Sequence, residues 1–180
     1  MKTLNGIIGV LLLTVFAACG PTLRPFTQEL YEEYGWTDAE LQKIQFYLSR
    51  DIVLHRQVST GTTEIISGEI KIVDGKEVEE IIIREGTPGV FMFSPKSNRL
   101  AVSFDDGSDE RFLMFGPNPK QNNRFVLLGS EWDRRSGKVS YEGQTYWVDA
   151  DVAYASLMVD LKKISKTKVK SHTAAGRRID

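Results

Sequence analysis

The side chains that could act as nucleophiles, metal ligands or general bases are few in this chain. It contains one cysteine, Cys19, and two histidines, His55 and His172. A Ser–His–Asp arrangement needs a histidine held between a nucleophile and a carboxylate, and a zinc site needs three or four ligands. His55 lies in a stretch with strand character and His172 lies near the basic end of the chain. We therefore predict no catalytic residue, no metal site and no cofactor.

Carboxylates gather at two places. The stretch Asp105–Glu110 could bind calcium through oxygen ligands, but its spacing does not match the calcium-loop pattern, so a solvated hairpin tip is favoured. The second group is Glu77, Glu79 and Glu80. Glu77 and Glu79 share one face of a predicted strand, and their repulsion indicates exposure or a basic partner nearby. A glycosidase needs two carboxylates across a cleft, and the sequence places no pair in that way.

Aromatic side chains are better candidates for binding a partner, such as a glycan or a peptide, although core packing explains most of them. Tyr146 and Trp147 are adjacent in a predicted strand, so they face opposite sides and one of them should be exposed. Trp132 lies in a polar stretch and is the first to test as a binding residue.

The chain ends in a basic segment that contains Lys166, Lys168 and Lys170. These lysines could contact phosphate groups on lipid, each contributing about 1 kcal/mol near an anionic surface. An acidic protein partner and a plain solubilising tail are the alternatives. The net charge of the whole chain is −1, which argues against a nucleic-acid partner.

The elements that must position these side chains begin after an N-terminal leader. Lys2 is followed by the apolar run Ile7–Phe16, and two alanines then precede Cys19. A basic start, an apolar run and small residues in that order are typical of a secretory signal peptide. The run is about ten residues long, too short for a helix that crosses roughly 30 Å of hydrocarbon.

A cysteine directly after two alanines resembles the lipobox of bacterial lipoproteins. The usual pattern has leucine three positions before the cysteine, and this chain has Phe16 there. The resemblance implies cleavage before Cys19, a diacylglyceryl group on its thiol and a further acyl chain, such as palmitate, on its amine. Gly20 rather than aspartate follows Cys19, which by the same resemblance implies the outer membrane, facing the periplasm. The alternative is an ordinary signal peptide with a chance cysteine.

Four segments follow from these patterns. We predict a signal peptide at 1–18, a lipid-proximal tether at 19–26, one domain at 27–165 and a flexible basic tail at 166–180. About 160 residues remain after the signal peptide, which is enough for a single domain with its own core.

The domain is expected to be mostly β, as one small antiparallel barrel or sandwich after a short helical segment. Thr27 and Gly35 bound the first helical turns, and Thr37 with Glu40 forms a capping box. Turn signals then recur about every 8 to 12 residues. The sequence Glu85–Val90 resembles the turn that enters a strand in bacterial SH3-like barrels, which implies that the fold is SH3-like in part.

The clearest hairpin is predicted between 62–73 and 76–84, around Asp74-Gly75, and a second tight turn is predicted at Glu142-Gly143. The two prolines in Gly116–Pro119 predict a rigid loop outside any ladder. Alternation of apolar residues over Leu157–Leu161 predicts a final strand, followed by a frayed segment.

The sequence as a whole favours a membrane-anchored envelope lipoprotein that acts as a non-enzymatic binding or scaffolding module. Its expected partners are the bilayer, through Cys19, and another envelope protein or a cell-wall component. Two alternatives stay open: a small envelope enzyme or accessory acting on cell-wall or glycan material, and a carrier of an apolar ligand.

Overall fold

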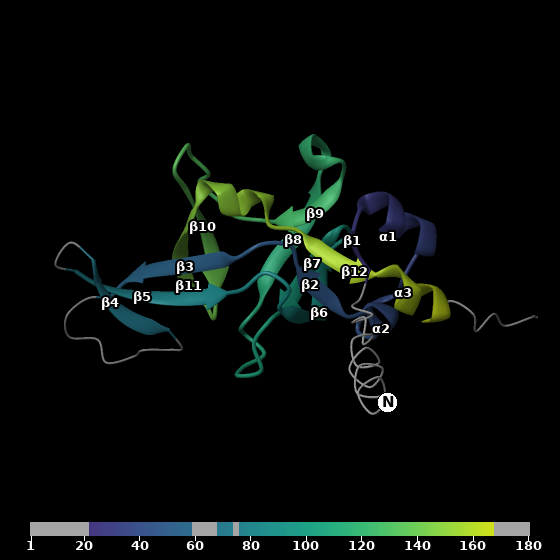
Figure 1. Ribbon diagram of the computed structural model, residues 1–180, viewed down its shortest axis with the longest axis horizontal. Coiled ribbons are helices and arrows are strands. Elements are labelled where there is room, and N and C mark those ends of the chain that lie inside the picture. Colours follow the sequence, from purple (N-terminus) through teal and green to yellow (C-terminus); the bar gives the residue numbers. More distant parts are fainter. Residues whose placement is uncertain (1–21, 59–67, 74–75, 168–180) are drawn as a thin grey trace, which may run out of the picture.

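The computed structural model describes residues 22–58, 68–73 and 76–167 (Figure 1). The side chains of 73 and 165–167 are not described, so Lys166 is placed by its backbone alone. Cys19, Lys168, Lys170 and the expected turn at 74–75 lie outside the described residues.

Strands dominate the described chain and form two antiparallel sheets (Figure 1). A seven-stranded sheet has the order β1-β12-β2-β6-β7-β8-β9, and a five-stranded sheet has the order β10-β11-β3-β5-β4. The mostly-β prediction is confirmed, and the arrangement is sandwich-like, since the described strands form two sheets and not one closed barrel. The strands are β1 (Leu23–Pro25), β2 (Phe46–Leu48), β3 (Ile52–Gln57), β4 (Glu69–Val73), β5 (Lys76–Ile83), β6 (Pro88–Lys96), β7 (Arg99–Ser103), β8 (Leu113–Asn118), β9 (Arg124–Leu127), β10 (Ser136–Tyr141), β11 (Gln144–Asp149) and β12 (Leu157–Asp160).

Short helices gather near the ends of the described chain. The first begins and ends where the sequence predicts, and the second begins at its predicted capping box. The Thr27 hydroxyl accepts a hydrogen bond from the Leu30 amide, and Gly35 ends the helix at a φ of 56°. The Thr37 amide donates to the Glu40 carboxylate at 2.9 Å, which completes the capping box. The helices are α1 (Gln28–Tyr34), α2 (Asp38–Leu41) and α3 (Leu161–Thr167), with 3-10 turns η1 (Pro119–Gln121) and η2 (Ala150–Tyr154).

The end of the described chain is helical, whereas the sequence predicts that the last strand continues through Leu161 and then frays. β12 stops at Asp160, whose carboxylate accepts a hydrogen bond from the Lys162 amide at 3.1 Å. This bond satisfies one of the free amides of the first helical turn. Ile164 is buried, so α3 packs one apolar side chain on the core and extends past the predicted domain boundary at residue 165.

The described residues include paired strands of both predicted hairpins. β4 and β5 pair antiparallel up to Val73 and Lys76, although 62–67 lies outside the described residues. β10 and β11 pair up to Tyr141 and Gln144. The two residues between them have positive φ, 49° for Glu142 and 70° for Gly143, as a type I′ turn requires.

Two chain segments pass directly from one sheet into the other. β2 leads into β3, and β5 leads into β6, so the pairs β2–β6 and β3–β5 form one bent ribbon. Asp51 holds the bend, since its carboxylate accepts from the Glu85 amide at 2.7 Å and from Arg84 at 2.8 Å. These bonds, the amide first, lower the pKa of Asp51 below its ordinary value.

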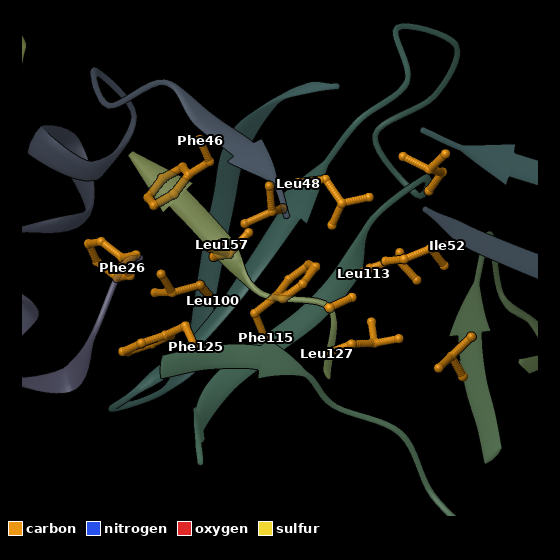
Figure 2. Packing of buried hydrophobic residues seen from close by; sticks show 14 of the residues in the cluster. Phe26, Phe46, Leu48, Ile52, Leu100, Leu113, Phe115, Phe125, Leu127 and Leu157 are labelled. Atoms are coloured by element: carbon orange, nitrogen blue, oxygen red, sulfur yellow. The ribbon is translucent and has the colours of Figure 1, made fainter. Parts of the chain in front are cut away.

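One hydrophobic core joins the two sheets (Figure 2). Burying a large apolar side chain contributes roughly 1.5–3 kcal/mol, so this cluster supplies the main stabilising term. Phe26, which follows β1, makes edge-to-face contacts with Phe46 of β2 and Phe125 of β9, at 5.2 and 4.9 Å between ring centroids. The labelled core residues are Phe26, Phe46, Leu48, Ile52, Leu100, Leu113, Phe115, Phe125, Leu127 and Leu157.

Candidate binding face

A row of polar and aromatic side chains crosses the outer face of the five-stranded sheet. Lys138 on β10 pairs with Trp147 on β11, Trp147 pairs with His55 on β3, and His55 pairs with Glu80 on β5. Residues directly opposite each other in antiparallel strands project from the same face. We call these four residues, Lys138, Trp147, His55 and Glu80, the Trp147 row. They come from four strands and are placed side by side only by the sheet register.

Trp147 is the exposed centre of this row, with 47 % of its surface accessible. The ammonium of Lys138 lies 4.6 Å from the centroid of its ring, within the range of a cation–π contact. Lys138 also forms an ion pair with Glu131. Ile82, which is 40 % exposed, lies two residues from Glu80 on the same face and adds apolar surface.

At the other end of the Trp147 row, the carboxylate of Glu80 has two basic neighbours. Its carboxylate forms an ion pair with Lys71 of β4, and its second oxygen lies 3.7 Å from Nδ1 of His55. The side chain of His55 is 35 % exposed. The face therefore offers an aromatic plane beside an imidazole and a carboxylate, which suits stacking combined with hydrogen bonding.

The reverse side of the same strands carries a buried ion pair. The carboxylate of Glu79 is completely buried, and its Oε2 accepts from Nη2 and Nε of Arg56 at 2.6 and 2.9 Å. The hydroxyl of Tyr146 donates to the same oxygen at 3.2 Å, and the Gly68 amide donates to Oε1 at 3.2 Å. Glu79, Arg56 and Tyr146 belong to β5, β3 and β11, so the cluster ties together the strands that carry the Trp147 row.

The ionisation of this cluster reflects burial and the Glu79 charge. Burial opposes the charge of Arg56, but the hydrogen bond and charge of Glu79 outweigh it and raise the pKa of Arg56. Burial, followed by the negative charge of Glu79, raises the pKa of Tyr146 to about 12. At neutral pH Arg56 is therefore charged and Tyr146 is a neutral phenol. The basic partner expected for the glutamate cluster is Arg56.

Tyr146 and Trp147 face opposite sides of β11, as their adjacency predicts, with Tyr146 buried and Trp147 exposed. Trp132 is placed differently, because its indole packs against the core and lies over two glycines. A Cβ at Gly137 would lie 2.3 Å from the Trp132 ring, and one at Gly129 would lie 2.9 Å from it. Trp132 is partly buried by this contact, and its role in binding remains a prediction.

His55, Glu80 and Lys138 belong to the face but were not predicted to lie together. The sequence places His55 on a strand surface, and only the register of β3 against β11 and β5 brings it beside Trp147 and Glu80. Such long-range pairing leaves no local sequence signal. The alternation of Tyr146 and Trp147 is the one signal that points to this face.

A separate hollow of about 300 Å³ lies between the turn at Glu142-Gly143 and the segment before β8. Glu142 accepts a hydrogen bond from Nε of Arg111 at 3.1 Å, so its carboxylate is engaged at the wall of the hollow. Arg111 also contacts Asp105 at 3.2 Å, which ties down the acidic loop. The hollow is lined by Glu110, Phe112, Ser140, Glu142 and Gly143.

Two further properties concern only the part of the chain that the structure describes. Within it, histidine, cysteine, aspartate and glutamate side chains form no group of three that could hold a metal ion. None of its helices has both the length and the apolar character needed to span a bilayer. Comparison of the chain with protein-family models, curated proteins and solved structures found no match.

Proposed function

We propose that this protein is a bacterial envelope lipoprotein, anchored through acyl chains on Cys19, that binds another envelope component without catalysing a reaction. The anchor would hold the domain at the outer membrane, facing the periplasm. Two or three acyl chains suffice for stable attachment, because each buried methylene contributes about 0.8 kcal/mol. Confinement near a partner then strengthens weak contacts by raising the effective concentration.

The observation that supports a binding role is the Trp147 row. A half-exposed tryptophan at the centre of a sheet face is costly to leave in water, and exposed aromatic surface with a polar rim is typical of interaction sites. The ion pair between Arg56 and Glu79 joins β3 to β5 on the opposite face of the same sheet. The partner proposed for this face is an envelope protein or a cell-wall component that offers a flat surface for stacking.

Site-specific photo-crosslinking in intact cells tests this proposal. A photoreactive residue at Thr145, which is exposed and two residues from Trp147 on the same strand face, should form adducts of defined mass. The matched control is a photoreactive residue at Tyr154, which is 56 % exposed and lies outside the five-stranded sheet. We expect adducts from position 145 and few or none from position 154.

A second variant separates binding from chance proximity. Trp147→Ala in the chain that carries the photoreactive residue at 145 should reduce the adduct yield at least tenfold, as loss of an aromatic anchor does at other interfaces. Equal yields from positions 145 and 154, or a yield that Trp147→Ala leaves unchanged, would show that this face is not the binding surface.

A further inference from the structure

Among the described strands, β4 forms an open edge of the five-stranded sheet. It is the last strand in the order β10-β11-β3-β5-β4, with β5 as its described neighbour. The opposite edge is already bonded, because Lys138 of β10 exchanges backbone hydrogen bonds with Ser130 at 2.8 and 2.9 Å. In the seven-stranded sheet, β9 bonds to Phe26 through the Phe125 amide, and β1 is only three residues long and ends in a proline. β4 is therefore the described edge most suited to pairing with a further strand.

The side chains of β4 alternate between exposed isoleucines and charged residues of opposite sign. Ile70 is 41 % exposed and Ile72 is 77 % exposed, and Ile70 lies opposite Glu79, on the inner face of the sheet. Glu69 and Lys71 lie on the outer face, and both are exposed. An extended edge with exposed β-branched side chains is a template for adding a strand from another chain.

Glu69 is placed unfavourably within a single copy of the chain. It lies directly opposite Glu80 on β5, and like charges in that position repel each other. Lys71 forms its ion pair with Glu80. Among the described residues, no cation forms an ion pair with Glu69. A cation on an added strand, opposite Glu69, would therefore relieve this repulsion.

A second copy of β4 would supply that cation if the two strands paired antiparallel with Ile70 at the centre. Ile70 would then lie opposite Ile70 of the second copy. On the outer face, Glu69 of each copy would lie opposite Lys71 of the other, and on the inner face Ile72 would lie opposite Gly68. Opposite charges and β-branched residues are the cross-strand pairs that stabilise sheets. Pairing centred on Lys71 would instead place the two lysines opposite each other, which is unfavourable.

We propose that two copies of this chain dimerise by pairing their β4 strands antiparallel, centred on Ile70. The twofold axis is then perpendicular to the sheet, so the two five-stranded sheets become continuous and keep their corresponding faces on the same side. Figure 1 shows β4 toward the end of the long axis opposite to α3, so the two copies would extend in opposite directions from the shared edge. The pairing needs no lipid and no residue of the leader, so it does not rest on the proposed function.

The dimer would give the candidate binding face a second copy of its site. The two Trp147 rows would lie on the same face of the joined sheet. The paired edge is five residues long, so the dimer is expected to bury less than the roughly 1,200 Å² of a standard interface and to depend on protein concentration. A partner with repeated surface features would bind both rows at once and gain affinity from the linkage.

Disulfide trapping in the purified full chain tests the dimer and its register. In the proposed dimer, Ile70→Cys lies opposite itself with Cα atoms about 4.5–5.5 Å apart, which suits a disulfide. Ile72→Cys is the matched control on the same strand face, and its two copies would be four residues apart along the strands, about 14 Å. The wild-type chain, oxidised in parallel, shows any dimer that forms through Cys19.

We expect Ile70→Cys to give at least about tenfold more covalent dimer than Ile72→Cys, because the second pair is too far apart to bond. Chance collisions would give the opposite order, since Ile72 is the more exposed residue. A mixture of Glu69→Cys and Lys71→Cys chains should give more covalent dimer than either chain alone. Circular dichroism and the melting temperature confirm that each variant is folded.

Charge variants in the Ile70→Cys chain test the proposed pairing of Glu69 with Lys71. Glu69→Lys should lower the yield of covalent dimer about tenfold, since two cross-strand pairs change from attraction to repulsion. Adding Lys71→Glu should restore the yield, because the charges between the copies are again opposite and the lysine at position 69 faces Glu80. Glu85→Lys makes the same change of charge at an exposed residue outside β4 and should leave the yield unchanged.

Three results would overturn this inference. Equal yields from Ile70→Cys and Ile72→Cys would show that the two β4 strands do not pair. A yield from Ile70→Cys that Glu69→Lys leaves unchanged would show that charge does not select the second copy. More covalent dimer from Lys71→Cys alone than from Ile70→Cys would show that the pairing is centred elsewhere. Each of these results leaves the lipidation of Cys19 and binding at Trp147 untouched, since those are measured in separate experiments.

Discussion

The carboxylate of Glu79 lies 2.6 Å from the guanidinium of Arg56, completely buried on the inner side of the sheet that exposes Trp147 on its outer side. A strand face that binds a partner must keep its side chains in register. The hydrogen bonds of Glu79 join β5 to β3 and β11. The buried pair is therefore a structural support for the face, and its removal should be measurable as a loss of stability.

Glu79→Gln should lower the free energy of unfolding by about 3 kcal/mol, because it leaves Arg56, whose side chain is 21 % exposed, without the fully buried carboxylate that pairs with it. Urea denaturation of the two proteins measures this difference. Glu80→Gln is the matched control on the same strand, since its ion pair with Lys71 is partly exposed and should contribute less than about 1 kcal/mol. The double variant Glu79→Leu with Arg56→Met should recover most of the loss, whereas a double variant as unstable as Glu79→Gln would contradict a charge-pairing explanation.

Tyr146 should make the protein sensitive to alkaline pH. Its pKa is about 12 in the folded protein against an ordinary value of 10.0. The folded protein therefore keeps the phenol proton above pH 10, where the unfolded chain releases it. The contribution of Tyr146 is present in full below pH 10 and is lost as the pH rises toward 12, by up to about 1.4 kcal/mol per pH unit.

Denaturation midpoints measured between pH 9 and 12 check this expectation for Tyr146. Tyr146→Phe should be less stable than the wild type at pH 8, through loss of the hydrogen bond to Glu79, and should show a shallower decline above pH 10. Identical slopes for the two proteins would show that Tyr146 titrates normally. Tyr141, whose pKa is also raised by burial, remains in both proteins and cancels in the comparison.

Gly137 should not tolerate a side chain while Trp132 is present. A Cβ there would lie 2.3 Å from Cε3 of Trp132, so Gly137→Ala must displace the indole. We expect a destabilisation of about 1–3 kcal/mol, the usual cost of forcing extra volume into a packed contact. In a Trp132→Ala background the same change should cost less than about 0.5 kcal/mol, and an equal cost in both backgrounds would show that the indole does not rest on this glycine.

Trp147→Ala should separate binding from stability. The side chain is half exposed, so its removal should change the unfolding free energy by less than about 1 kcal/mol while reducing crosslinking from the sheet face. Trp36→Ala is the informative contrast, because Trp36 stacks on Phe26 and Tyr34 beside the core. That variant should be destabilised by about 3 kcal/mol and retain binding per folded molecule.

Local signals predicted the parts of this fold that depend on local chemistry. Thr37 and Glu40 lie three residues apart and form a capping box wherever a helix begins there. Glu142 and Gly143 adopt the positive φ values that a two-residue hairpin demands. These features need no knowledge of the rest of the chain, which is why the sequence alone predicts them.

Features that depend on distant partners were not predictable in the same way. Pro117 lies within β8 and pairs with Phe125, although the prolines indicate a loop. β7 pairs with β8 only as far as Phe115, so Pro117 has a single neighbouring strand and its missing amide is tolerated. The strand within the predicted tether at 19–26 was missed for the same reason. Leu23–Pro25 forms a strand only through its pairing with β12.

The candidate site also combines features that local sequence predicts with features that depend on distant strands. Alternation along β11 predicts that Tyr146 and Trp147 face opposite sides, but the identity of the exposed one depends on which face meets the other sheet. Trp147 and His55 are brought together by a register between strands far apart in the chain. The buried partner of Glu79 follows from the register of β3 against β5, in which Arg56 lies opposite Glu79.

The mass of the N-terminal peptide of the mature protein, purified from membranes, tests the central claim most directly. We predict a peptide that begins at Cys19 and carries a diacylglyceryl group, and we predict that Cys19→Ser abolishes both the modification and membrane attachment. A mature chain that begins elsewhere, or an unmodified Cys19 in a membrane-bound protein, would contradict the anchored binding module described here.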